Sequence, residues 1–161
     1  MSMLYIRAAR PADVPFIVAL IRELAEYERA PQEAKATDAM IHDALFGPHP
    51  ACEALIGEVD GKAEGLALFF HNFSTWTGRR GLYLEDLFVR PSARGKGLGE
   101  MLLRKVARIA VERGCPRVEW TVIDWNAPAI NFYGKLGAVP LDQWTVHRLS
   151  GEALTRVAEG D

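Results

Sequence analysis

Residues Leu82 to Glu100 read LYLEDLFVRPSARGKGLGE. The apolar part, Leu82 to Val89, predicts a strand, and three glycines follow within the six residues from Arg94 to Gly99. Such a turn lets the backbone take positive φ angles, and the helix that follows begins with unpaired N–H groups. A phosphate or pyrophosphate fits this geometry and its partial positive charge. The stretch therefore predicts an anion site directly after a strand that carries two carboxylates, Glu85 and Asp86.

The charged residues of the turn, Arg94 and Lys96, strengthen the expectation of an anion site. Glycines at this spacing also occur in ordinary turns and in dinucleotide-binding or kinase loops, so spacing alone leaves these alternatives open. A generic nucleotide-binding domain is disfavoured because no lysine–serine pair of the Walker type follows the glycines.

Composition limits the class of protein. A chain of 161 residues and 17.9 kDa, with 49% apolar residues, predicts one domain over residues 1–161 with a full core. Its 19 basic and 21 acidic residues are mixed throughout, which disfavours a nucleic-acid partner. The N-terminus lacks the pattern of a leader, and no apolar run approaches the length of a membrane span. We therefore expect a soluble, cytoplasmic protein.

The two cysteines, Cys52 and Cys115, lie far apart in the sequence. They form no CxxC motif, and no histidine has the spacing of a zinc ligand. The sequence therefore predicts two reduced thiols and no metal site.

Hydrophobic periodicity predicts the first half of the fold. A strand at Leu4 to Ala8 precedes a helix over residues 16–24 that Asp13 can cap, and Thr37 can cap a second helix over residues 40–46. Two apolar runs, residues 55–59 and 65–70, flank an Asp-Gly pair and predict a hairpin. A polar loop is expected over residues 74–81 before the strand at 82–89.

The second half predicts a helix over residues 101–110 that ends near Gly114, and a strand over 117–123. A helix then runs from Asn126 or Ala127 to Gly137, and residues 145–149 form a candidate strand. A strand, a helix and a strand in series imply a parallel crossover. The fold class is mixed α/β (α+β), with one central sheet, antiparallel first and parallel around the glycine turn, and helices on both faces.

Two motifs carry a family resemblance. The turn from Arg94 to Gly99 resembles the pyrophosphate loop of the GNAT acetyltransferases, whose pattern is Q/R-x-x-G-x-G/A. The stretch WNAPAINFY, residues 125–133, resembles the closing motif of that family. There an asparagine, here Asn126, and a tyrosine seven positions later, here Tyr133, flank the cofactor thiol.

Within this family the chain looks most similar to the diamine (spermidine/spermine) N-acetyltransferases and to the thialysine N-epsilon-acetyltransferase branch. The likeness spreads over IRELAEYE at 21–28, FGPHP at 46–50, STWTGR at 74–79, YLED at 83–86 and DWNAPAINFY at 124–133. The loop at 74–76 and the turn at 124–126 look more like the thialysine branch.

The resemblance implies the GNAT fold, acetyl-CoA as co-substrate, a small-molecule amine as acceptor, no metal, and a homodimer. It implies that the acetyl-CoA is bound by Leu87, Phe88 and Val89, by Arg94, Gly95, Lys96, Gly97, Leu98, Gly99 and Glu100, and by Asn126, Ala127, Pro128, Ala129 and Tyr133. The amine side would be formed by Tyr27, Glu28, Trp76, Glu85, Asp86, Glu119, Trp120 and Thr121.

The chemistry of acetyl transfer assigns roles to two of these residues. An alkyl amine has a pKa of about 10.4, so near neutral pH only about one molecule in a thousand carries the lone pair that attacks a thioester. Glu85 is the candidate general base, acting directly or through a water, because burial raises the pKa of a carboxyl group. Tyr133 is the candidate general acid to the CoA thiolate.

Alternatives stand beside these roles. Glu85 and Asp86 are also compatible with ion pairs to Arg79 or Arg80, Tyr133 with a core residue, and Trp76 with packing or a dimer contact. At the level of the whole protein, the alternatives are a GNAT enzyme that acts on a protein N-terminus or an aminoglycoside, and a CoA-binding regulatory module without turnover.

Overall fold

A computed structural model describes residues 1–160 of the chain. Residues Met1–Ile123 form one compact unit, and a second unit begins at Asp124. The first unit contains the sheet and its covering helices, and the second contains two helices joined by an extended segment.

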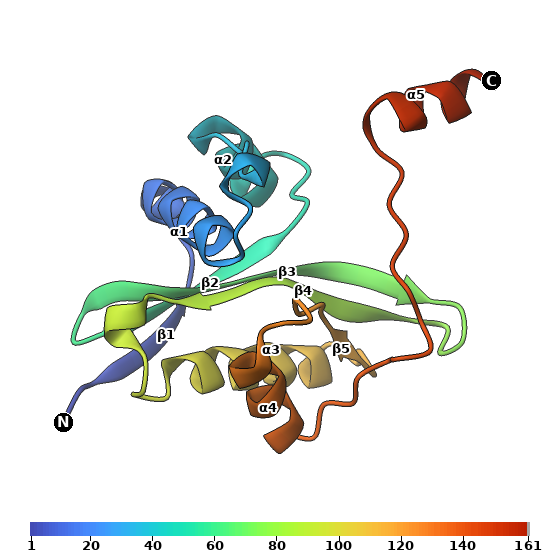
Figure 1. The fold of residues 1–161 in the computed structure, drawn as a ribbon. Helices are drawn as coiled ribbons and strands as arrows, with labels where there is room; N and C mark the ends of the chain where they lie inside the picture. The colour runs from blue at the N-terminus through green and yellow to red at the C-terminus, as the bar shows by residue number, and fades with distance from the viewer. Residues whose placement is uncertain (161) are drawn as a thin grey trace. The chain divides into compact units, whose positions relative to one another are not determined.

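The first unit is built on one five-stranded sheet in the order β1-β2-β3-β4-β5 (Figure 1). The strands are β1 (Leu4–Ala8), β2 (Glu53–Val59), β3 (Lys62–Ser74), β4 (Arg79–Val89) and β5 (Val118–Glu119). The first four pair antiparallel, and β4 pairs with β5 in parallel. This confirms the predicted mixed sheet.

Helices cover both faces of this sheet. Figure 1 shows α1 (Val14–Tyr27) and α2 (Asp38–Phe46) on one face and α3 (Leu98–Glu112) on the other. Between the sheet and the first two helices lies a core cluster: Ile17, Leu20, Leu45, Ala54, Ile56, Leu66, Leu68 and Phe88. No helix in the described chain, residues 1–160, combines the length and the apolar character that crossing a bilayer requires.

Local signals in the sequence set several boundaries. The hydroxyl of Thr37 accepts a hydrogen bond from the Met40 N–H at 3.2 Å and so caps α2 as predicted. Asp60 and Gly61 both take positive φ angles, 50° and 82°, in the predicted hairpin turn. Asp13 precedes α1 but does not cap it, because its carboxylate binds the guanidinium of Arg7 at 2.7 Å.

Two glycines let α3 approach the sheet closely. A Cβ on Gly57 of β2 would lie 2.9 Å from a methyl of Leu98, and a Cβ on Gly65 of β3 would lie 3.1 Å from one. Leu98 is the first residue of α3 and is only 1% exposed. The start of this helix, which follows the glycine turn, is therefore fixed against the middle of the sheet.

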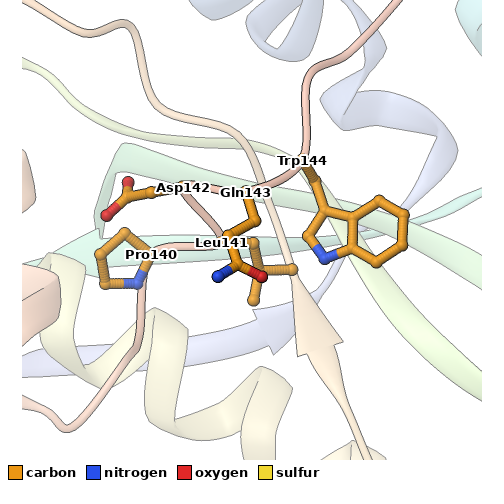
Figure 2. A pocket seen from close by; sticks show the side chains of 5 residues that line it. All are labelled: Pro140, Leu141, Asp142, Gln143 and Trp144. Carbon is orange, nitrogen blue, oxygen red and sulfur yellow. The ribbon is translucent and has the colours of Figure 1, made fainter.

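The second unit contains α4 (Ala127–Lys135) and α5 (Gly151–Glu159). The prediction of a strand at residues 145–149 was wrong, because the segment between the two helices has no strand ladder. This segment includes a pocket lined by Pro140, Leu141, Asp142, Gln143 and Trp144 (Figure 2). None of these residues belongs to the predicted sites.

Two strand lengths also differ from expectation. β5 spans two residues rather than residues 117–123, and the loop between β3 and β4 is short because the ladder runs out to Ser74 and Arg79. A polar composition at residues 74–81 did not prevent pairing, because side chains on a projecting hairpin can remain in water on both faces while the backbone pairs.

Candidate functional site

A β-bulge shapes the middle of β4. Leu68 of β3 pairs with Asp86, and the next residue, Phe69, pairs with Leu84, so Glu85 is an extra residue without a partner on β3. Bulges of this kind occur next to active sites, where they redirect a side chain. Glu85 is exposed and Asp86 is partly buried. Two consecutive carboxylates are thus held at one kink in the sheet.

A third carboxylate, Glu28 from the C-cap of α1, lies near this kink. Burial, which is the largest cause, and the negative charges of Glu85 and Glu28 together raise the pKa of Asp86 to about 6. Burial also raises the pKa of Glu28. The structure therefore brings together three of the predicted amine-side residues, Glu28, Glu85 and Asp86, which we name the acidic cluster.

The acidic cluster has no basic partner. Within residues 1–160 seven carboxylates form ion pairs with lysine or arginine: Asp13, Glu23, Glu53, Glu58, Glu64, Glu100 and Glu152. No member of the cluster is among them, so the alternative of ion pairs to Arg79 or Arg80 is wrong. Uncompensated negative charge in a partly buried place favours a cationic ligand.

Cys52 lies close to the same cluster, a position that no motif in the sequence indicated. Burial raises the pKa of its thiol, and the charges of Asp86, Glu53 and Glu85 raise it further. Its Sγ is 3.9 Å from the carbonyl oxygen of Ala44. Both cysteines are free thiols, as predicted, and Cys52 stays protonated near neutral pH.

Further predicted amine-side residues lie on β5 and the β3–β4 hairpin. Glu119 pairs with Tyr83 across the parallel ladder and accepts a hydrogen bond from the Asn72 amide at 3.4 Å. Trp120 and Thr121 follow at the end of this short strand. Trp76 lies at the hairpin tip and is 79% exposed.

The edge of β4 is open beyond the bulge. Within the first unit β5 pairs with β4 only at Leu82 and Tyr83, so residues 84–89 have no strand on that side. Backbone N–H groups at such an edge are available to a ligand that lies along the strand. This edge includes Leu87, Phe88 and Val89, the predicted acyl-binding residues.

The glycine turn has the predicted backbone. Gly95 and Gly97 take φ angles of 81° and 89°, and a Cβ on either would meet no atom within 4 Å. Gly97 is the N-cap of α3, and no side chain caps this helix. The first N–H groups of α3 are therefore presented at an open turn, as an anion site requires. Glu100, in the first turn, pairs with Arg104 at 2.7 Å.

Arg94 adopts an unexpected position. Its Nε donates to the carbonyl oxygen of Val89 at 2.9 Å, and its guanidinium lies over two aromatic rings, 5.1 Å from the centroid of Tyr27 and 5.4 Å from that of Phe88. Lys96 is also exposed on the turn.

In the second unit, Asn126 begins α4. Its Oδ1 accepts a hydrogen bond from the Ala129 N–H at 3.3 Å, and Pro128 occupies the first turn. Tyr133 lies further along the same helix, partly buried, with its ring 5.4 Å from that of Phe132. The predicted closing motif is therefore a capped helix that carries a tyrosine.

Comparison with known families decides the assignment. The model of the acetyltransferase (GNAT) family matches residues 17–138, which is more than half of the chain. The chain belongs to the GNAT family.

Relatives of this GNAT chain extend over nearly its whole length. It is 36% identical to thialysine N-epsilon-acetyltransferase from Sus scrofa, with 98% of this chain and 99% of that protein aligned. It is 34% identical to L-ornithine N5-acetyltransferase from Arabidopsis thaliana, over 94% of this chain and 86% of that protein. The protein is therefore an N-acetyltransferase.

A solved structure supports the same fold. An integron cassette protein from the mobile metagenome of V. cholerae superposes with a TM-score of 0.80 at 28% identity, covering 97% of this chain and 98% of that one. The GNAT fold expected from the sequence is confirmed.

Proposed function

We propose that this GNAT enzyme transfers the acetyl group of acetyl-CoA to a primary amine of a small diamine, polyamine or lysine-like amino acid such as thialysine. The observation that carries this proposal is the acidic cluster, whose three carboxylates take part in none of the ion pairs found within residues 1–160. A substrate with a second cationic group would supply the missing positive charge. Relatives named for thialysine and for L-ornithine support an acceptor of this size and charge.

The acidic cluster would also remove the proton of the amine. Glu85 is proposed as general base, directly or through a water, since the bulge exposes its side chain at the kink in β4. Glu28 and Asp86 are proposed to hold the substrate's cationic groups. Tyr27, Trp76, Glu119, Trp120 and Thr121 complete the proposed amine side.

The acyl group would be held along β4. The family's co-substrate is acetyl-CoA. We propose that N–H groups at the open edge of residues 87–89 polarise its carbonyl, and that the turn from Arg94 to Glu100 receives its pyrophosphate. The neutral amine attacks the carbonyl carbon, the C–S bond breaks, and Tyr133 donates a proton or a hydrogen bond to the leaving thiolate. Asn126 to Ala129 are proposed to begin the helix that presents this tyrosine.

Residues 1–161 are proposed to act as one GNAT domain in a homodimer, without a metal. The match to the thialysine N-epsilon-acetyltransferase from Sus scrofa supports a single domain, because 99% of that protein is aligned. The homodimer rests on the family resemblance.

A substrate panel tests the proposal. CoA release would be followed with spermidine, spermine, putrescine, thialysine, lysine, ornithine, an aminoglycoside and a short peptide, from pH 7 to 9. Turnover on a diamine, polyamine or lysine-like amino acid supports the proposal, and the ratios of kcat/KM separate these acceptors. Turnover only on the peptide or the aminoglycoside contradicts it, and acetyl-CoA binding without any turnover indicates a binding module.

A further inference from the structure

The connection between β4 and α3 is tied to α1 by two arginines. Arg90 binds Glu23 through its Nε at 3.1 Å and its Nη2 at 3.0 Å, and its guanidinium lies 5.1 Å from the ring centroid of Phe16. Arg94 lies over Tyr27, the last residue of α1. Both arginines come from the segment that precedes the glycine turn, and all three partners belong to α1.

Arg94 connects the two halves of the proposed site. It is the first residue of the glycine turn, and its Nε donates to the last carbonyl of β4, Val89. Its guanidinium packs on Tyr27, which directly precedes Glu28 of the acidic cluster. Tyr27 and Phe88 are themselves in contact, with ring centroids 6.3 Å apart. The first residue of the turn therefore contacts both the end of β4 and the end of α1.

We propose that Arg94 is a positioning residue that fixes the glycine turn relative to Glu28, so that the acyl-donor and amine sites are held in register. Its Nε donor holds the turn to β4, and its guanidinium holds the turn to Tyr27. The proposal rests on the proposed function, which places pyrophosphate at the turn and the amine at the acidic cluster. The hydrogen bond from Nε is directional and sets the start of the turn against the end of β4. The cationic guanidinium over the rings of Tyr27 and Phe88 sets it against the end of α1.

Three substitutions separate the donor from the charge. In Arg94→Gln the amide nitrogen takes the place of Nε, so the donor to Val89 is kept and the charge is lost. In Arg94→Lys the charge is kept over the rings, but a methylene replaces Nε. Arg94→Ala removes both. Because Arg90 still ties the connection to Glu23, we expect all three proteins to fold.

The experiment measures CoA affinity by calorimetry and the KM of the best amine from the panel. We expect Arg94→Ala and Arg94→Lys to weaken CoA binding about tenfold, and Arg94→Gln, which keeps the donor, to stay within about threefold of the wild type. We expect Arg94→Ala and Arg94→Gln, which leave no cation over Tyr27, to raise the amine KM about fivefold, and Arg94→Lys to raise it less. The matched control is Arg108→Gln, the same change at an exposed position of α3, which leaves both constants unchanged.

Two results would overturn the proposal. If Arg94→Lys keeps the CoA affinity of the wild type and Arg94→Gln does not, the charge and not the Nε donor positions the turn for CoA. If Arg94→Ala weakens CoA binding with no change in the amine KM, the turn and the amine site are not coupled. CoA affinity is measured without turnover, so the order of the three variants tests the donor role even if no amine in the panel is acetylated.

Discussion

Glu28 lies close enough to Asp86 that its charge contributes, after burial and the charge of Glu85, to the raised pKa of Asp86. The two residues come from different elements, the end of α1 and the bulge of β4. Neither has a basic partner within residues 1–160. Folding therefore assembles a repulsive arrangement, and such arrangements occur where a ligand supplies the opposite charge.

Asp86→Asn should stabilise the folded protein above pH 6. The pKa of Asp86 is raised from 3.8 to about 6, so between these values the folded chain holds a proton that the unfolded chain releases. The free energy of unfolding therefore falls as pH rises through this window. Asparagine removes the penalty, and we expect a gain of about 1–3 kcal/mol at pH 7.5 and a much smaller one at pH 4.5. Urea unfolding at both pH values measures it.

The control for this prediction is Glu26→Gln, at an exposed position of the same helix that carries Glu28. Its unfolding free energy should change little at either pH. An equal gain for Asp86→Asn at both pH values would contradict an electrostatic origin. Asp86→Asn is also expected to bind the amine more weakly, because a charge that serves binding often lowers the stability of the free protein.

Glu85→Gln should lower the rate of acetyl transfer most where the amine is protonated. A general base typically contributes about 10²–10⁴-fold, and its loss matters less as pH approaches the amine pKa because more neutral amine is present. We therefore expect the ratio of wild-type to variant kcat/KM to shrink from pH 7 to pH 9. A ratio near one at pH 7 would remove Glu85 from the mechanism.

The sequence predicted the elements that are set by local pattern. The strand, glycine turn and helix around residues 82–110 follow from periodicity and from glycine's freedom at positive φ, and Gly95 and Gly97 take such angles. The acidic pair at 85–86 was visible as two polar residues that break the alternation of β4. Its third member, Glu28, was visible only through the family resemblance.

Long-range geometry could not be predicted in the same way. Nothing near Arg94 in the sequence indicates that its guanidinium packs on Tyr27, because the ring comes from an element 67 residues earlier. The alternation at residues 145–149 suits a strand, but a strand also needs a partner edge, and no periodicity identifies one. The shift in register that leaves Glu85 unpaired likewise depends on two strands together.

Gly57→Ala should displace the start of α3. The new Cβ would lie 2.9–3.2 Å from three side-chain carbons of Leu98, and the neighbouring core leaves little room for that side chain to move. We expect a loss of about 1–3 kcal/mol in unfolding free energy, as for other overpacked sites, and a higher KM for acetyl-CoA. In the double variant Gly57→Ala/Leu98→Ala the clash is absent, so the two changes should cost less together than the sum of each alone. If the loss of unfolding free energy in the double variant equals the sum of the two single losses, the contact does not position the helix.

Tyr133→Phe should lower kcat while leaving acetyl-CoA binding nearly unchanged. The ring and its contact with Phe132 are kept, and only the hydroxyl that would protonate the leaving thiolate is lost. If C–S bond cleavage limits turnover, we expect kcat to fall by about 10²-fold or more, with CoA affinity by calorimetry within about twofold of the wild type. Acetyl-CoA analogues with a more acidic leaving thiol would then restore part of the rate, because a better leaving group needs less help from an acid. If the variant keeps full kcat, or if weaker CoA binding explains its loss of activity, the role of Tyr133 is to pack α4. The thiolate would then have no proton donor from this helix.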